Sequence, residues 1–562
     1  MNYLDYIVIA SYFLFVIGIG VRFTKKAGKN LDEYFLSGRE LPWWLAGVSM
    51  VATTFAADTP LAVTGIIATS GIAGNWLWWN FLLSGMFTVF FFAHLWRRAG
   101  VMTDVEFAEI RYSGTPAKIL RGFRALYLAI PINVVIMGWV TVGMAKVVNI
   151  AFGWDQWQTL ILLYGITALY ILLSGMWGVV LTDFIQFFIA MAGSVVLAVF
   201  AVKEVGGIAG LKSGLIEQFG ENHHLLDMSP FSPKLAIATV LVWIGMQWWA
   251  SWYPGAEPGG GGYIAQRMFS AKNEKHSVLA TLFFNVAHYA LRPWPWILVG
   301  LASLVVFPGL DDSELGYPKM MVSLLPNGLL GLLTVAFLAA FMSTISTHLN
   351  WGASYIVNDF YKRFLKPKET DAHYVFVSRI AIIFLMGLAI GVSYVFESVK
   401  GGWEFLLAVG AGTGLVYILR WYWWRINAWS EISAMVAAFL TTVVLKILGI
   451  SGFAPIMIWT TFVTTIVWTS VTFLTKPESN ETLFSFVNRV RPGGFGWRKF
   501  STTNQSEKLL DKFWMWIAGC VSVYSFLFGI GKVIFGEQIL GFSLIIIGFI
   551  SGLFIVFRFK KL

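Results

Sequence analysis

The segment LAAFMSTISTHLN, residues 338–350, places four hydroxyl groups inside a long apolar run from about 327 to 361. On a helix, Ser343, Thr344 and Thr347 share one face with Ala340, and Ser346 lies beside Ser343. Such hydroxyls can bond back to their own helix and let neighbouring helices pack closely. They can also bind an alkali cation together with carbonyl oxygens of a broken helix. The segment alone favours packing, whereas the rest of the chain favours the cation.

The composition is that of a polytopic membrane protein. Of 562 residues, 57% are hydrophobic and 12% charged, and the mean hydropathy is +0.71. A soluble chain carries roughly 25% charged residues. The net charge of +10 would suggest nucleic-acid binding in a soluble protein, but here it indicates membrane topology. We therefore expect the lipid bilayer as a partner, no nucleic acid and no evident protein partner. Cys520 is the one cysteine, which excludes an intrachain disulfide.

About fifteen segments are long enough to cross roughly 30 Å of hydrocarbon, which predicts an all-α polytopic membrane protein. The first of them has no basic residue before it, and Arg22 and Lys25 follow it, so it resembles a retained helix more than a signal peptide. The segments lie near 3–22, 41–70, 75–96, 120–150, 157–175, 178–203, 234–270, 276–307, 327–360, 374–397, 402–420, 430–448, 454–474, 512–533 and 538–557.

Basic residues give these segments an orientation. Most of the 40 lysines and arginines fall in alternate loops and in the tail with Arg558, Lys560 and Lys561. Because cytoplasmic loops carry the excess of basic residues, we expect the N-terminus outside and the C-terminus in the cytoplasm, in the cell (inner) membrane. The basic loops are 22–40, 97–124, 358–379, 421–430 and 475–511.

Two segments contain helix breakers. Ala56-Ala57-Asp58-Thr59-Pro60 puts a charge and a proline in the second, and Tyr253-Pro254-Gly255-Ala256-Glu257-Pro258 precedes Gly259 to Gly262 in the seventh. Unwound backbone at membrane depth lines a cavity or is buried in protein. The breaks lie five segments apart, so the two halves have opposite orientations, as in the inverted repeats of transporters. The glycine run would also suit a flexible loop just outside the membrane.

Asp183 is a further charge inside an apolar segment. A carboxylate at that depth usually faces the interior of the bundle and has a functional role. Near the start of a helix, it can instead simply stabilise the helix dipole. Its position alone leaves both interpretations open.

Four motifs resemble those of the sodium:solute symporter family, which includes sodium-coupled sugar, proline and sialic acid transporters. The resemblance covers roughly 30–430 and implies a LeuT-type core of 5+5 inverted-repeat helices, with one N-terminal and about four C-terminal extra helices. The motifs are Asp32-Glu33-Tyr34-Phe35-Leu36-Ser37-Gly38-Arg39 with Leu41-Pro42-Trp43-Trp44, Thr182-Asp183 with Gln186, Tyr263-Ile264 with Gln266-Arg267, and Ala340 with Met342-Ser343-Thr344.

The resemblance also divides the chain into parts. Residues 1–40 would form the N-terminal helix and a cytoplasmic loop, and 204–233 an extracellular loop. The two inverted repeats would be 41–203 and 234–430, and accessory helices would occupy 431–562.

Two ion sites follow from the resemblance, so the implied cofactor is Na⁺, one ion or two. The main sodium site would use the carbonyls of Ala52, Phe55 and Ala340 and the hydroxyls of Ser343 and Thr344. A second site, which some members have, would use Asp183, Ser343, Ser346 and Thr347. The ligands of the main site are all neutral oxygens, which suit a monovalent ion that must also be released.

The family places solute contacts on the broken helices and their neighbours. Sugar transporters of the family carry a glutamate–glutamine pair where this chain has Asp58-Thr59, and asparagine–glutamine where it has Gly261-Gly262. Both departures argue against simply assigning a sugar. His288 also suits a buried histidine with structural partners, and the Trp clusters 76–79 and 421–424 suit interfacial belts. The expected solute-binding residues are Asp58, Thr59, Trp78, Tyr263 and His288.

These observations predict a sodium-coupled secondary active symporter that imports a small organic solute by alternating access. An enzyme is not expected, since the histidines are scattered and no HExxH or Gly-x-Ser-x-Gly motif occurs. A channel would need a continuous polar pore, which broken helices around one closed cavity do not suggest. The solute and the oligomeric state are open at this stage.

Overall fold

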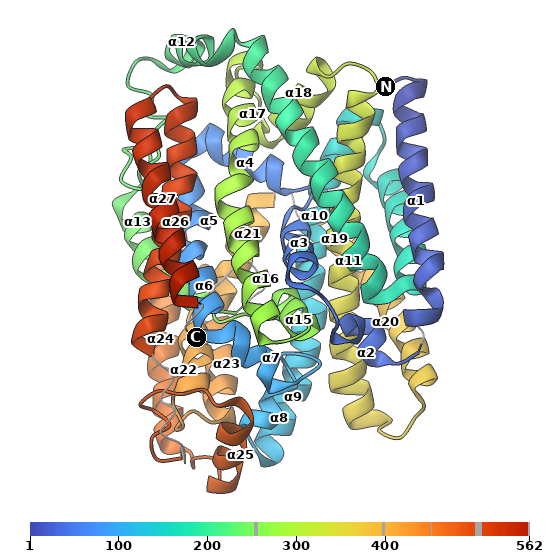
Figure 1. Cartoon of the computed structure of the whole chain (residues 1–562), viewed down its shortest axis with the longest axis vertical. Helices are drawn as coiled ribbons and strands as arrows, with labels where there is room; N and C mark the ends of the chain where they lie inside the picture. The colour runs from blue at the N-terminus through green and yellow to red at the C-terminus, as the bar shows by residue number, and fades with distance from the viewer. Residues whose placement is uncertain (28, 252–256, 396–398, 451, 501–508, 560–562) are drawn as a thin grey trace.

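A computed structural model describes residues 1–562 except 28, 252–256, 396–398, 451, 501–508 and 560–562. The described residues form helices joined by short loops, with two isolated bridges and no strand among them. Long helices run between an end that carries α12 (Gly207–Phe219) and an end that carries α25 (Asn480–Val490) (Figure 1). The expected break at Tyr253–Ala256 and the basic tail residues Lys560 and Lys561 lie outside the described residues.

The N-terminal half contains the first broken span and the long helices that follow it. Its helices are α1 (Tyr3–Ala27), α2 (Leu31–Leu36), α3 (Trp43–Thr54), α4 (Thr59–Ser70), α5 (Trp76–Trp79), α6 (Phe81–Phe87), α7 (Ala93–Ala99), α8 (Phe107–Arg111), α9 (Gly114–Tyr127), α10 (Asn133–Phe152) and α11 (Gln156–Glu204). The π-helical turns η3 (Thr88–Phe92) and η4 (Leu128–Ile132) join α6 to α7 and α9 to α10.

The C-terminal half follows α12. Its helices are α13 (Ile237–Val242), α14 (Trp248–Ala250), α15 (Gly262–Ser270), α16 (Glu274–Val286), α17 (Pro293–Val306), α18 (Gly316–Leu324), α19 (Leu329–Ser354), α20 (Asp371–Val392), α21 (Val399–Gly410), α22 (Gly414–Tyr422), α23 (Ala428–Ile447), α24 (Phe453–Leu474), α26 (Leu509–Ile534) and α27 (Gln538–Phe559). The π-helical turns η6 (Ala287–Leu291) and η8 (Tyr355–Leu365) follow α16 and α19.

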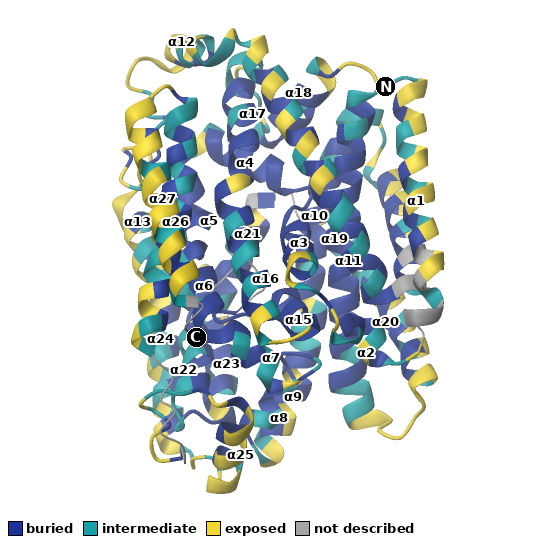
Figure 2. Cartoon of the chain, in the orientation of Figure 1, coloured by how far each residue is buried: buried dark blue, intermediate teal, exposed yellow. Residues whose placement is uncertain are grey.

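The helices have the length and hydropathy of membrane spans. Within the described residues, ten are long and apolar enough to cross a bilayer, or twelve if each bent pair is one span. Two of the fifteen expected segments, 157–175 and 178–203, form α11, whose backbone leaves helical geometry at Gly175 (φ 52°, ψ −148°). Outer helices such as α1 and α27 expose side chains on one face, whereas α3, α10 and α19 are buried (Figure 2).

The first break is confirmed. Helix α3 ends at Thr54, α4 begins at Thr59, and their axes differ by 55°. Pro60 sits in the first turn of α4, where its missing N–H costs nothing. Pro60 and Asp58 thus end one helix and start another inside the membrane.

The glycine run after the second break is buried, so it is not a loop in solvent. Gly259 and Gly260 have φ of 86° and 96°, which side chains rarely adopt. A Cβ at Gly259 would lie 2.9 Å from the ring of Phe92. These glycines therefore bring the backbone into close contact with η3 just before α15 begins.

Two groups of packed helices surround the breaks. In the group that we term the bundle, α3, α7, α15 and α16 pack on one another. In the group that we term the scaffold, α10, α19 and α20 pack on one another, and α9 packs on η8. Helices α11 and α19 also pack against α3, so the broken span lies where the two groups meet.

Candidate functional site

The polar face of α19 lies against the end of α3. Thr344 Oγ1 donates to the carbonyl oxygen of Thr53 at 2.9 Å and to that of Ala340 at 3.0 Å. Thr347 Oγ1 lies 3.2 Å from Thr53 Oγ1. The structure thus brings the Ala340–Thr347 face to the helix end that contains Ala52 and Phe55, all of them buried.

The carbonyls at the end of α3 suit a cation. The last carbonyls of a helix have no partner in the next turn and carry partial negative charge. The Phe55 N–H donates to the oxygens of Val51 (2.9 Å) and Ala52 (3.0 Å), which tightens this turn. The expected ligands are neutral oxygens on α3 and α19, the ligand type that suits sodium.

Asp183 forms the centre of a second polar network, on α11. Its carboxylate accepts from Ser343 Oγ and Ser49 Oγ, both at 2.5 Å. The guanidinium of Arg267, on α15, lies 3.6 Å from the same carboxylate, and both side chains are fully buried. Asp183 lies eight residues beyond the Gly175 kink, inside the helix, so it does not occupy the first turn of a helix.

The residues expected around a second ion only partly converge on Asp183. Arg267 also donates to Thr347 Oγ1 at 2.8 Å, so a cationic side chain already contacts two of the four residues. Ser346 Oγ donates to the carbonyl of Ser343 in its own helix at 3.2 Å.

A small cavity lies beside the first break. The ring of His288 is 5.6 Å from that of Trp78, edge to face, and its Nδ1 is 3.0 Å from Thr54 Oγ1. The cavity brings together three of the five expected solute-binding residues. It is lined by Thr59, Leu77, Trp78, Phe81, His288, Arg292, Trp403 and Leu407.

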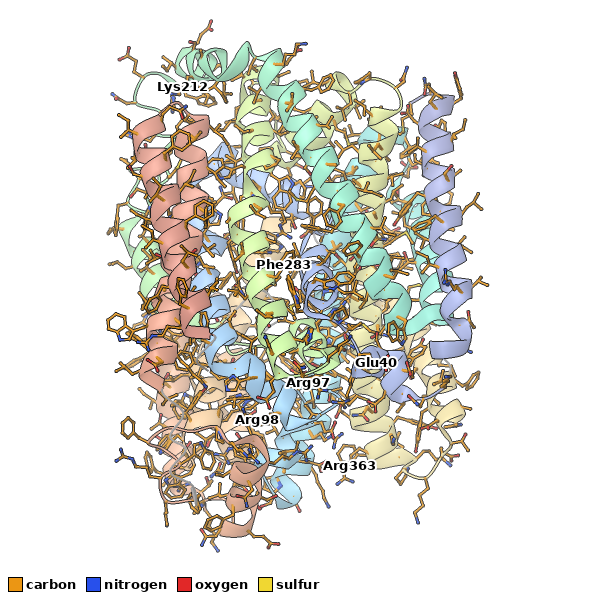
Figure 3. All side chains as sticks on the ribbon, in the orientation of Figure 1. Glu40, Arg97, Arg98, Lys212, Phe283 and Arg363 are labelled. Atoms are coloured by element: carbon orange, nitrogen blue, oxygen red, sulfur yellow. The ribbon has the colours of Figure 1, made fainter. Side chains whose placement is uncertain are left out.

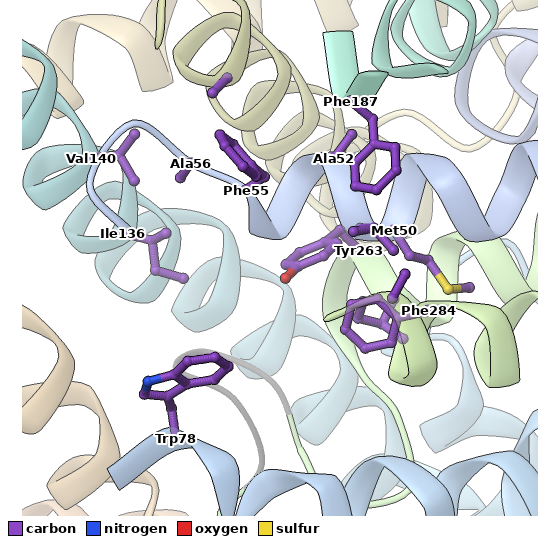
Figure 4. Close-up of a cluster of buried hydrophobic side chains, with 14 of the residues drawn as sticks. Met50, Ala52, Phe55, Ala56, Trp78, Ile136, Val140, Phe187, Tyr263 and Phe284 are labelled. Atoms are coloured by element: carbon purple, nitrogen blue, oxygen red, sulfur yellow. The ribbon is translucent and has the colours of Figure 1, made fainter. Parts of the chain in front are cut away.

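Asp58 and Tyr263 do not belong to the lining of this cavity. The Trp403 indole donates to Asp58 Oδ2 at 3.3 Å, which links Asp58 to the cavity wall. Tyr263 is buried, with its ring 5.5 Å from that of His348. Its hydroxyl points from the α3 end toward the side on which Trp78 and Ile136 lie (Figure 4).

Arg292 is a cavity residue that the sequence did not single out. Its Nη1 donates to the carbonyl of Val51 (3.1 Å) and to Thr54 Oγ1 (3.0 Å), so a cation sits at the C-terminal end of α3. Asp58 occupies the opposite position, before the N-terminus of α4. Each charge complements the dipole of the helix end beside it. The sequence signal that could have identified Arg292 is its position as a lone arginine within the apolar segment 276–307.

The aromatic clusters require a correction. Trp76, Trp78, Trp79 and Trp421 are buried, so these four do not face the membrane surface as expected, whereas Trp423 and Trp424 are half-buried. Trp78 lines the cavity, and the Trp421 ring packs on Phe107 with centroids 4.2 Å apart. Composition alone cannot separate these two placements, because Trp is favoured at both.

Comparison with known proteins gives one family. A model described as "Sodium:solute symporter family" matches residues 34–438. A sodium/glucose cotransporter 2 of Rattus norvegicus is 26% identical over 71% of this chain, and the match spans 64% of the rat protein's own length. A sodium/glucose cotransporter of Vibrio parahaemolyticus is 25% identical over 83% of this chain and 90% of that protein.

A solved structure shares the fold. The substrate-bound outward-open state of a Na⁺-coupled sialic acid symporter has a TM-score of 0.70 to this structure. The match covers 85% of this chain and 99% of the symporter, at 19% identity. The all-α LeuT-type fold expected from the sequence is thereby confirmed.

Proposed function

The chain belongs to the sodium:solute symporter family, and we propose that it imports a small organic solute by alternating access, driven by sodium. Its inverted repeats are 41–203 and 234–430, as the two breaks suggest. The observation that carries the proposal is the contact of Thr344 with Thr53. In this contact the Thr344 hydroxyl of α19 lies beside the carbonyls at the end of α3, across the boundary between scaffold and bundle.

One sodium ion binds at the main site, between Ala52, Phe55, Ala340, Ser343 and Thr344. Sodium joins α3 to α19 and thereby favours the state that is open to the outside, where the solute binds. Release of sodium to the cytoplasm separates the two helices and frees the solute. An ion held across this boundary would affect both groups of helices at once.

We assign no second ion, since Arg267 already supplies a positive charge to Asp183. One sodium ion is sufficient for active import. It gains roughly 2.3 kcal/mol in moving down 100 mV, and a tenfold concentration gradient adds about 1.4 kcal/mol. Together they sustain a solute gradient of a few hundredfold.

The solute is a neutral molecule rich in hydroxyl groups, of the sugar class. The formal charges at the break, Asp58 and Arg292, cancel, so the site does not require a charged solute. Trp78 and Trp403 offer apolar ring faces, and the Asp58 carboxylate accepts hydrogen bonds from hydroxyls. The sodium/glucose cotransporters among the relatives support this class, although Asp58-Thr59 and Gly261-Gly262 differ from their residues. A different arrangement of hydroxyls is therefore recognised.

The α25 end faces the cytoplasm, which places the N-terminus outside the cell membrane. Basic side chains such as Arg97, Arg98 and Arg363 lie toward that end (Figure 3). The acidic Asp311 belongs to the loop before α18, near the α12 end. The positive-inside rule supports this orientation.

A thermal-shift screen of the purified protein tests the function. Monosaccharides, amino acids and carboxylates are added one at a time, once in sodium chloride and once in potassium chloride. We expect a monosaccharide to raise the melting temperature in sodium only. Stabilisation by an acidic solute, or equal stabilisation in potassium, would contradict the assignment.

A further inference from the structure

Four buried charges form a closed ring at the α25 end. Arg124 donates to Glu257 at 2.7 Å and to Glu431 at 2.9 Å. Arg420 pairs with the same two carboxylates, with Glu431 at 3.2 Å. All four side chains are at most 8% exposed. Each arginine thus bridges both glutamates, and the buried Asp104, 3.9 Å from Arg124, adds a negative charge beside the ring.

Aromatic groups enclose the ring and keep its members in place. The guanidinium carbons of Arg124 and Arg420 lie 4.9 and 5.0 Å from the centre of the Tyr417 ring. The Tyr112 hydroxyl donates to Glu431 at 2.5 Å. Ion pairs in such surroundings are strong only while every partner is present, because an unpaired buried charge is costly.

The members of the ring come from both sides of the boundary between bundle and scaffold. Glu257 precedes α15, which belongs to the bundle, and Arg124 lies on α9, which packs with the scaffold. Arg420 ends α22 and Glu431 begins α23. Sodium at the main site would cross the same boundary nearer the middle of the membrane.

A cavity lies directly behind the ring. Its lining includes Arg124, Glu257 and Tyr417, and it extends to Val409 and Gly410 at the bend between α21 and α22. Glu257 and Arg124 therefore form part of the wall of this cavity. Movement of the bundle away from the scaffold would have to separate Glu257 from Arg124.

We propose that Glu257 closes the transport pathway on the cytoplasmic side by pairing with Arg124 and Arg420. The role rests on the proposed orientation and function. Opening to the cytoplasm separates Glu257 from Arg124 and hydrates both charges, while Arg420 and Glu431 hold α22 to α23. Glu257 is thus a positioning residue for transport, since it fixes which side the pathway faces.

A neighbouring ion pair on α9 provides a matched control. Arg121 pairs with Asp359 of η8 at 2.7 Å, and Asp359 is fully buried. Helix α9 packs on η8, and α10 packs on α19, so this pair lies within the scaffold. Its loss should cost stability without altering access to the pathway.

Cysteine labelling from the cytoplasmic side tests the proposal. In a Cys520→Ser background, Val409→Cys is exposed to a membrane-impermeant thiol reagent in inside-out vesicles, in sodium chloride. We expect Glu257→Gln, which keeps the shape of the side chain, to raise the labelling rate tenfold or more. Asp359→Asn should leave the rate within twofold of the parent.

Two results would overturn the proposal: an unchanged rate in Glu257→Gln, or an equal rise in Asp359→Asn. If Glu257→Gln does not reach the membrane, the labelling rate is measured in Arg420→Lys instead. Lysine keeps the positive charge but cannot bridge both glutamates. We expect a several-fold rise there, and an unchanged rate counts against the proposal. Sodium-driven uptake by the parent is measured separately, so failure of the proposed function is recognised independently of the labelling.

Discussion

Thr344 donates its hydroxyl hydrogen to the carbonyl oxygen of Thr53, 2.9 Å away, and so joins α19 to the end of the broken helix α3. The two residues are 291 positions apart in the chain. The contact sets a polar group of the scaffold against helix-end carbonyls of the bundle. The proposed coupling of transport to sodium depends on this junction.

The first prediction concerns the hydroxyls at that junction. Thr344→Ala and Ser343→Ala should each raise the sodium concentration for half-maximal uptake tenfold or more, because each removes one of about five oxygen ligands. Thr334→Ala is the matched control, since Thr334 is buried on the same helix and donates only to Leu330 in its own backbone. Wild-type sodium dependence in both variants would mean that the hydroxyls serve packing alone.

The second prediction concerns Asp183 and Arg267. Asp183→Asn leaves a buried guanidinium without its counter-charge, which should cost about 3–5 kcal/mol of stability. The double variant Asp183→Asn/Arg267→Gln should regain part of the lost melting temperature, because it no longer buries an unpaired charge. The Hill coefficient for sodium should be near one in the parent and in any variant that still transports. A parent coefficient near two would mean that a second ion binds, and a fall toward one in Asp183→Asn would identify Asp183 as its charged ligand.

The third prediction concerns the solute. Asp58→Asn should weaken monosaccharide binding about tenfold to hundredfold, since a hydrogen bond to a charged group contributes about 1.5–3 kcal/mol. Trp403→Phe keeps a ring and removes the indole donor to Asp58, so a smaller loss is expected. Both are measured by thermal shift at saturating sodium. Unchanged binding in Asp58→Asn would place the solute elsewhere.

The fourth prediction concerns orientation. A cysteine at Lys368, in the exposed loop between η8 and α20, should react only from the cytoplasmic side. A cysteine at the exposed Asp311 should react only from outside. If the topology is the reverse, the cysteine at 368 will react only from outside and the one at 311 only from the cytoplasm. Glu257 would then close the opposite side of the pathway.

Local signals predicted the fold and much of the site. Asp58 and Pro60 marked the first break, and the hydroxyl stripe at 343–347 marked the face of α19 that meets α3. Arg292, Trp403 and the partners of Glu257 were harder to predict because their roles depend on long-range contacts. Arg124 and Glu431, for example, are 307 positions apart. The buried tryptophans at 76–79 and Trp421 were misplaced because a tryptophan-rich segment suits a buried wall as well as a membrane surface.

The most direct test of sodium coupling is the steady-state accumulation of a labelled monosaccharide in proteoliposomes. The membrane potential is clamped at zero, and sodium outside is tenfold above sodium inside. With one ion per neutral solute, the accumulation ratio should approach about ten, and about one when potassium replaces sodium, because one tenfold gradient supplies about 1.4 kcal/mol. A ratio of about one in sodium, with the solute entering all the same, would contradict coupled transport.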